Sequence, residues 1–150
     1  MARRDPDEFL ESFSALSRCL RAVAARTYAT FEVGSTQAKF LRHIGQHSRI
    51  SQAELARATQ TDPTLTGRVL EPLMERGWVR RKRSEEDRRQ YLLELTAAGQ
   101  RARERVEEVR KSIVERLVAE LDERDLEDFN RIVKKLLTAL NAPDESPKPE

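Results

Sequence analysis

The densest charge in the sequence lies in one stretch of ten residues, Arg80 to Arg89. Six of these residues are basic and three are acidic, so the net charge of the stretch is +3. Clustered guanidinium and ammonium groups bind phosphates and release the counterions around them. The stretch therefore indicates a polyanionic partner, and the plainer alternative is a solvated charged surface. Its basic members are Arg80, Arg81, Lys82, Arg83, Arg88 and Arg89.

The three acidic residues in this stretch, 85–87, would repel a polyanion and therefore need a structural reason. Asp87 is placed to pair with Arg89 or Arg83 across a loop and to hold that loop rigid. Arg88 or Arg89 is then free to enter the minor groove of DNA, where narrow A·T tracts attract guanidinium groups.

A second stretch, residues 64–68, holds three polar side chains and lies in the first turns of a helix that is predicted to run from Asp62 to Arg76. Asp62 is a capping residue, and Pro63 costs no hydrogen bond in a first turn. Because the major groove admits an α-helix and arginine can bond guanine at two points, Arg68 is the best candidate for a base contact. The residues predicted to face DNA are Thr64, Thr66, Gly67 and Arg68. The predicted core face is Leu65, Val69, Leu70 and Leu73.

Two more helices are predicted before this one. Ser35 is a candidate N-cap for a helix that ends at about residue 47, with Phe40, Leu41 and Ile44 on its apolar side. Ser51 and Glu54 fit a capping box for a short helix over SQAELARAT, since each side chain can satisfy a backbone donor of the other residue. Only residues 59–61 separate this short helix from the next, which is typical of a helix-turn-helix.

Beyond Gly77, which ends the helix, the periodicity changes. Residues 78–83 and 90–95 are predicted as the two strands of a hairpin with a charged tip, and Trp78 is expected to anchor it to the core. A helix-turn-helix followed directly by a hairpin predicts a winged helix, in which the hairpin reaches DNA beside the recognition helix.

Long helices with apolar seams flank this region, one over residues 7–31 and two after Thr96, the last capped by Asp122. A central region of about 60 residues is too small to cover the seams, so a second copy of the chain is expected, with an intrachain bundle as the alternative. The predicted dimer contacts are Phe9, Phe13, Leu16, Ile113, Leu117, Leu121, Phe129, Val133, Leu136 and Leu140.

These elements predict one mainly α-helical folding unit with a small β-wing, a winged helix-turn-helix with N- and C-terminal dimerisation helices. Residues 1–34 and 96–141 form the predicted dimerisation region, and residues 35–95 form the DNA-binding region. Residues 142–150 hold three prolines among charges and are predicted to be disordered.

Composition excludes several other classes. The single cysteine, Cys19, cannot form an intrachain disulfide, and neither a secretory signal nor an apolar run of about 18 residues is present, so a cytoplasmic chain without a membrane partner is expected. The sequence holds no phosphate-binding glycine loop, nucleophile elbow or acid-base pair, so we expect neither an enzyme nor a cofactor. His43 and His47 are spaced to share a metal, but without a third ligand ordinary histidines are favoured.

The run TLTGRVLEPLMERGWVRRKRSEEDRRQYLLELTAAG resembles the recognition helix and wing of the MarR family of bacterial transcription regulators. The resemblance includes the glycine and apolar residue before the hairpin, the DRR element of the wing and the LT..G pattern after it. It implies a dimer that binds a near-palindromic operator on double-stranded DNA, represses nearby genes and responds to small aromatic or amphipathic ligands.

The resemblance also implies roles for individual residues. Asp87 and Arg89 match the family's wing aspartate and arginine, and residues 64–68 match its base-reading turns. At the start of the preceding helix, the candidate phosphate contacts are Ser35, Thr36 and Gln37.

Two residues depart from a regular recognition helix. Pro72 removes a backbone hydrogen bond and is expected to distort the last turns, and Gly67 lowers helix propensity by up to about 1 kcal/mol, unless it lets DNA approach the backbone. With the acidic tip, these departures support an alternative: a winged-helix adaptor or antagonist that binds another protein. A ligand-binding protein without regulatory output is a third possibility, distinguished by whether any ligand alters DNA affinity.

Two further questions stay open at the level of sequence. Cys19 is either an oxidant-sensing thiol or, as is commoner, a small buried residue. Four aromatic residues of the first two helices either line a ligand pocket or fill a core, and the core is favoured: Phe13, Tyr28, Phe31 and Phe40.

Overall fold

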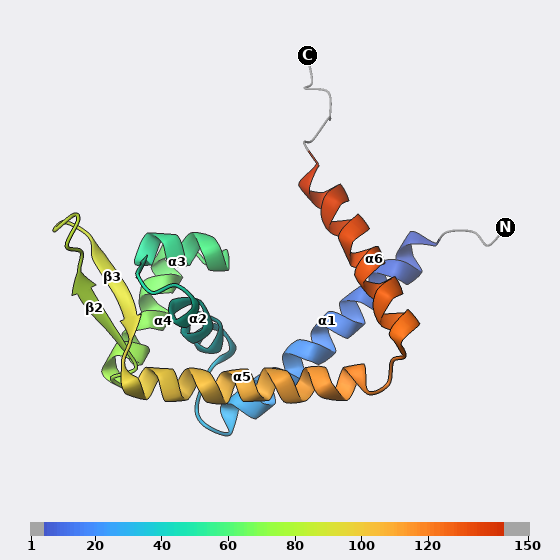
Figure 1. Ribbon diagram of the computed structural model, residues 1–150, viewed down its shortest axis with the longest axis horizontal. Coiled ribbons are helices and arrows are strands. Elements are labelled where there is room, and N and C mark those ends of the chain that lie inside the picture. Colours follow the sequence, from blue (N-terminus) through green and yellow to red (C-terminus); the bar gives the residue numbers. More distant parts are fainter. Residues whose placement is uncertain (1–4, 143–150) are drawn as a thin grey trace, which may run out of the picture. The chain divides into compact units, whose positions relative to one another are not determined.

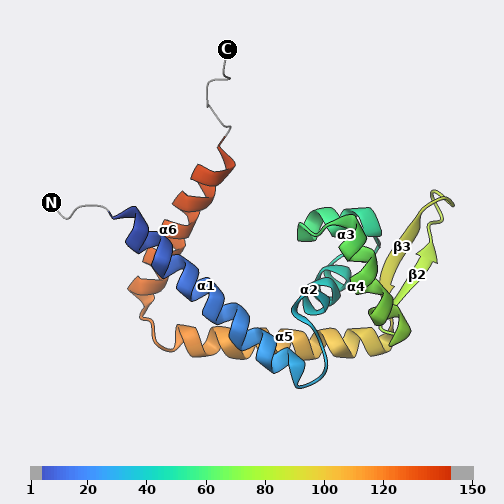
Figure 2. The same ribbon diagram turned by 180° about the vertical axis from the view of Figure 1, so that it is seen from behind.

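The computed structural model describes residues 5–142, which form six helices and a small antiparallel sheet (Figures 1 and 2). The chain divides into two compact units, one ending at Lys111 and the other beginning at Ser112, within α5. The elements are α1 (Pro6–Ala29), α2 (Ser35–Gln46), β1 (Ile50–Ser51), α3 (Gln52–Thr59), α4 (Pro63–Glu75), β2 (Val79–Arg83), β3 (Tyr91–Leu95), α5 (Ala97–Val118) and α6 (Glu123–Asn141). The predicted disordered tail falls, apart from Ala142, outside the described residues.

Side-chain caps start three of the six described helices, α3, α4 and α6, where the sequence predicts them. Asp62 accepts the backbone N–H groups of Thr64 and Leu65, and Ser51 and Glu54 form their reciprocal pair. The hydrogen bonds that Glu54 makes with Ser51 lower the pKa of the Glu54 carboxyl. The expectation for α2 was wrong by one position: Gly34 is the N-cap and Ser35 is the first helical residue.

The wing strands β2 and β3 pair in antiparallel register from Val79 opposite Leu95 to Arg83 opposite Tyr91. A third strand, β1, pairs with the other edge of β3, so the sheet order is β1-β3-β2. β1 has two residues, too few for a period-two pattern to reveal it, and it ties the start of α3 to the wing.

The core of the first unit fixes the helix-turn-helix. Side chains from α2, α3, α4, β3 and α5 are fully buried together, and Tyr28 at the end of α1 joins them. The largest of these are Phe40, Leu41, Ile44, Leu55, Leu70, Leu73, Leu93 and Val106. Burial of Tyr28 and Phe40 confirms the core interpretation for them, whereas Phe13 is exposed.

The recognition helix, the wing and α5 pack closely where they meet, and this meeting point is called the junction below. Gly77 has φ of 71°, which an L side chain rarely adopts, and turns the chain from α4 into β2. The Thr96 hydroxyl donates to the carbonyl of Gly77 and accepts the Gly99 N–H. Gly99 lies so close to Trp78 that a Cβ there would be 1.9 Å from its carbonyl oxygen. The LT..G pattern therefore has a packing reason, and Trp78 does anchor the wing.

Candidate nucleic-acid interface

The first turns of α4 present a different set of side chains from the predicted one. Thr64 and Arg68 are exposed, but Thr66 is fully buried and its hydroxyl donates to the carbonyl of Asp62 at 2.9 Å. Thr66 is therefore a packing residue, and its placement on the DNA-facing side was wrong. Leu65, predicted in the core, is 48% exposed instead.

The recognition helix α4 runs without interruption through both residues that depart from a regular pattern. It continues past Pro72 to Glu75, so the proline sits in the last turn and does not end the helix. Gly67 is half-buried, and the nearest atom to a Cβ placed there would be Nε2 of Gln52 at 3.4 Å, an ordinary contact. Packing within the chain therefore does not demand glycine at this position.

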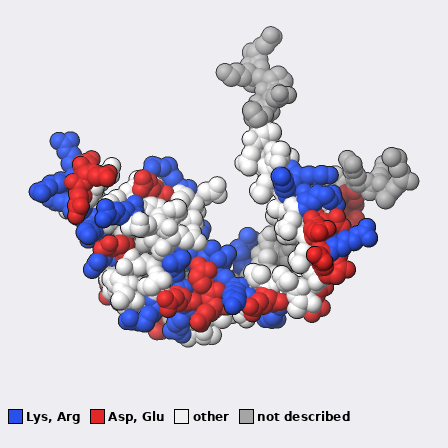
Figure 3. All heavy atoms as spheres, viewed as in Figure 1, with Lys and Arg blue, Asp and Glu red and all other residues white. Residues whose placement is uncertain are grey.

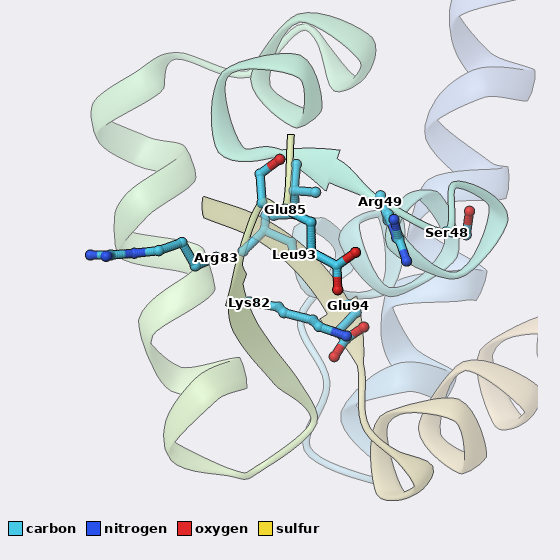
Figure 4. A pocket seen from close by; sticks show the side chains of 9 residues that line it. Ser48, Arg49, Lys82, Arg83, Glu85, Leu93 and Glu94 are labelled. Carbon is cyan, nitrogen blue, oxygen red and sulfur yellow. The ribbon is translucent and has the colours of Figure 1, made fainter. Parts of the chain in front are cut away.

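Strand alternation sorts the wing's basic residues between two faces. Val79 is buried against the core, so Arg81 and Arg83 share its face, and Arg80 and Lys82 lie on the other face. In Figure 4, Arg83 and Lys82 extend in opposite directions from β2. The sequence pattern Val-Arg-Arg-Lys-Arg already held this signal, because a strand residue two positions from a buried valine shares its side.

The two faces have different partners. On the outer face, Arg80 is held in an ion pair with Glu94 at 2.5 Å. On the core face, Arg83 donates to the hydroxyl of Tyr91 at 3.1 Å, which lowers the pKa of that phenol. Arg81 donates to the side chain of Gln52, the first residue of α3, at 3.2 Å. Gln52 was not identified from the sequence, and Arg81 was named only as one of the basic residues of the wing.

The pocket that residues of the outer face of the wing help to line is very small. The pocket in Figure 4, near Arg49, Lys82 and Glu94, has a volume of about 10 Å³. A single water molecule fills a space of this size.

The wing tip is held by the backbone, not by the predicted charge pair. The Asp87 carboxylate accepts the backbone N–H of Arg89 at 3.0 Å, and the backbone N–H of Asp87 donates to the hydroxyl of Ser84. Within residues 5–142, no ion pair joins Asp87 to an arginine side chain, so that expectation was wrong. Arg88 and Arg89 are exposed. At the tip of the wing, basic and acidic side chains lie side by side (Figure 3).

The start of α2 offers fewer free groups than predicted. Ser35 is exposed and Thr36 is half-buried, but the side-chain oxygen Oε1 of Gln37 already accepts the backbone N–H of Gly34 at 2.9 Å. The ammonium group of Lys39 donates to the carbonyl of Thr59 and so ties α2 to the helix-turn-helix connection.

His43 and His47 stack with their ring centroids 6.2 Å apart. Among the described residues, no group of three or more His, Cys, Asp or Glu side chains is placed to hold a metal ion. Cys19 is exposed, so the interpretation of a buried small residue was wrong for the single chain. In the part of the chain that the structure covers, no helix is both long and apolar enough to cross a bilayer.

We expect His43 to make the stability of the fold depend on pH. Burial lowers the pKa of its imidazole, and the charges of Arg42, His47 and Lys39 act in the same direction. Because the folded-state pKa lies below the unfolded one, the unfolded chain binds more protons, and the contribution present at neutral pH is lost as the pH falls. We expect Tm to fall between about pH 7 and about pH 5, and His43→Gln to flatten this slope. Equal slopes for the two proteins in thermal denaturation would refute the assignment.

Comparison with known proteins places this geometry among DNA-binding regulators. The sequence model of the MarR family matches residues 34–91. The HTH-type transcriptional repressor Mb2911 of Mycobacterium bovis is 33% identical over 96 residues, which are 64% of this chain and 69% of that protein.

Solved structures show the same fold. Streptococcus pneumoniae FabT in complex with DNA superposes with a TM-score of 0.82 at 17% identity, over 91% of this chain and 97% of that one. Staphylococcus aureus MarR in complex with salicylate and kanamycin gives a TM-score of 0.79 at 20% identity, over 89% of this chain and 91% of that one.

Proposed function

The chain belongs to the MarR family, and on that premise we propose that it is a dimeric, sequence-specific DNA-binding transcription regulator of the repressor type. The observation that carries the proposal is the joint exposure of Thr64 and Arg68 on α4 and of Arg88 and Arg89 at the wing tip. A helix whose first two turns carry free polar groups and a basic hairpin beside it fit a major groove and the adjacent minor groove.

The likeness to a DNA-bound regulator supports this reading over an adaptor that binds a protein. We place the chain in the cytoplasm because that is where a bacterial operator lies. A salicylate-bound relative supports a small aromatic or amphipathic effector. Such an effector must change the DNA affinity, and DNA must change the effector's affinity by the same factor.

Each recognition helix reads one half-site, so a near-palindromic operator requires two copies of the chain, with half-site centres about 34 to 36 Å apart. The terminal helices supply apolar surface for the contact, since most of their predicted interface residues are exposed in one chain. These exposed residues are Phe9, Phe13, Leu16, Leu117, Leu121, Phe129, Leu136 and Leu140. Ile113 and Val133 are half-buried.

We expect the double substitution Phe129→Glu and Leu136→Glu to produce a folded monomer. Both side chains are exposed in the single chain, so charge there removes apolar contact between copies without opening a core. Light scattering should give the parent protein a mass twice the 17.3 kDa of one chain and give the variant that of one chain. Lys135→Glu on the same helix is the control and should stay dimeric. A dimeric double variant would place the interface elsewhere.

Selection from random duplex DNA tests the function itself. The full-length protein should enrich an inverted repeat whose half-sites lie about one helical turn apart, and its affinity should fall steeply with salt. A folded protein that enriches no sequence at low salt would favour the adaptor.

A further inference from the structure

Two side chains, one from β2 and one from α3, meet beside the backbone of the recognition helix α4 at Gly67. Arg81 of β2 donates from Nη2 to Oε1 of Gln52 on α3. The amide nitrogen of Gln52 lies 3.4 Å from where a Cβ of Gly67 on α4 would be. The Gln52 carbonyl oxygen therefore orients the guanidinium, and the amide nitrogen faces α4.

These two side chains keep unused donors. Within residues 5–142, the remaining N–H groups of the Arg81 guanidinium and the amide nitrogen of Gln52 have no hydrogen-bond partner. Arg81 is exposed and Gln52 is half-buried, so water satisfies these donors in the free protein. A group of donors that includes one fixed positive charge and lacks a free acceptor is suited to an oxyanion.

An open hollow of about 340 Å³ adjoins Arg81 and is lined by Gly67, Glu71, Met74, Glu75 and Arg81. Glu71 and Glu75 lie one and two turns beyond Gly67 on α4, and their carboxylates repel anions. An anion is therefore restricted to the end of the hollow at Gly67, where the missing side chain leaves room. The donors and the repulsion together define one position.

We propose that Arg81 and Gln52 bind one phosphate of the DNA backbone where a strand passes between α4 and the wing. The inference rests on the proposed DNA-binding function and adds a contact that fixes the protein's register on the duplex. Phosphate contacts position a protein and carry no sequence information. Arg80 and Lys82, on the opposite face of the same strand, do not share this role.

Salt dependence separates a phosphate contact from general charge. Arg81→Ala should reduce the slope of log affinity against log salt by about one per subunit, and equally on any sequence. Gln52→Glu should weaken binding more than Gln52→Ala, because a carboxylate pairs with Arg81 and repels the phosphate. Arg80→Ala and Lys82→Ala carry the matched loss of one charge and should leave the slope nearly unchanged.

A neutral methylphosphonate, placed at one phosphate at a time in the selected duplex, locates the contact. One position should weaken the parent protein about tenfold and leave the already weakened Arg81→Ala unaffected. The phosphate site would be overturned if the losses of affinity from Arg81→Ala and from the methylphosphonate were additive at every position. Equal salt slopes for Arg81→Ala and Arg80→Ala would overturn it too, while the DNA binding of the parent protein would still stand. A parent protein that binds no DNA would instead overturn the proposed function.

Discussion

Arg68→Ala should lose about 1 to 3 kcal/mol of DNA-binding free energy per half-site and accept more than one base at the position that Arg68 reads. Arg68 is exposed on the second turn of α4, and its guanidinium has no partner within the described residues. Its donors are therefore free for a guanine edge, and the substitution removes no contact that holds the fold. The measurement is titration of the parent and the variant against the selected operator and each single-base change at the half-site.

Two other arginines serve as comparisons. Arg89→Ala should weaken binding to all sequences and flatten its salt dependence, because a wing-tip residue contributes charge more than base recognition. Arg80→Ala should have little effect, since that side chain is paired with Glu94 on the outer face. An Arg68→Ala protein that retained parental affinity and base preference would remove Arg68 from the base contacts.

Gly99→Ala should destabilise the fold by about 3 kcal/mol, the upper end for an overpacked site. A methyl group at Gly99 would lie 1.9 Å from the carbonyl oxygen of Trp78, and backbone cannot move aside as a flexible side chain can. Relief of this clash requires α5 to move away from the wing. That movement strains the hydrogen bonds of the Thr96 hydroxyl to Gly77 and to Gly99. Chemical denaturation of both proteins measures the difference.

Gly67→Ala is the matched control. It introduces the same methyl group into a helix at a position where the nearest atom, Nε2 of Gln52, would lie at an ordinary contact distance. It should raise the free energy of unfolding by up to about 1 kcal/mol, because alanine has the higher helix propensity. If Gly99→Ala were as stable as the parent, the junction would be looser than described.

The sequence predicted several element boundaries from a cap or from a change of period. Asp62 with Pro63, Ser51 with Glu54, and Gly77 stand at the boundaries that the structure shows. It could not predict β1, whose two residues are a strand only because β3 lies beside them. The N-cap of α2 was displaced by one residue because Gly34 has no side chain to signal it.

The residues of the site were predicted less completely than the elements. Hydrogen-bond partners decide which side chains are free to contact DNA, and the sequence does not show those partners. Thr66 reads as a polar surface residue, but its hydroxyl bonds the carbonyl of Asp62 four residues earlier, so it can be buried at little cost. The Asp87 carboxylate accepts the backbone N–H of Arg89, so it bonds the backbone where the sequence suggested a guanidinium. Gln52 and Arg81 are 29 positions apart, and only the fold brings them together.

The ratio of two dissociation constants, for the selected operator and for a scrambled duplex of equal length and composition, tests sequence-specific binding most directly. At physiological salt the operator should bind at least about a thousandfold more tightly, as specific regulators do. A ratio near one for folded, dimeric protein would show that the basic wing binds DNA only as a polyanion, and would contradict a sequence-reading role for α4.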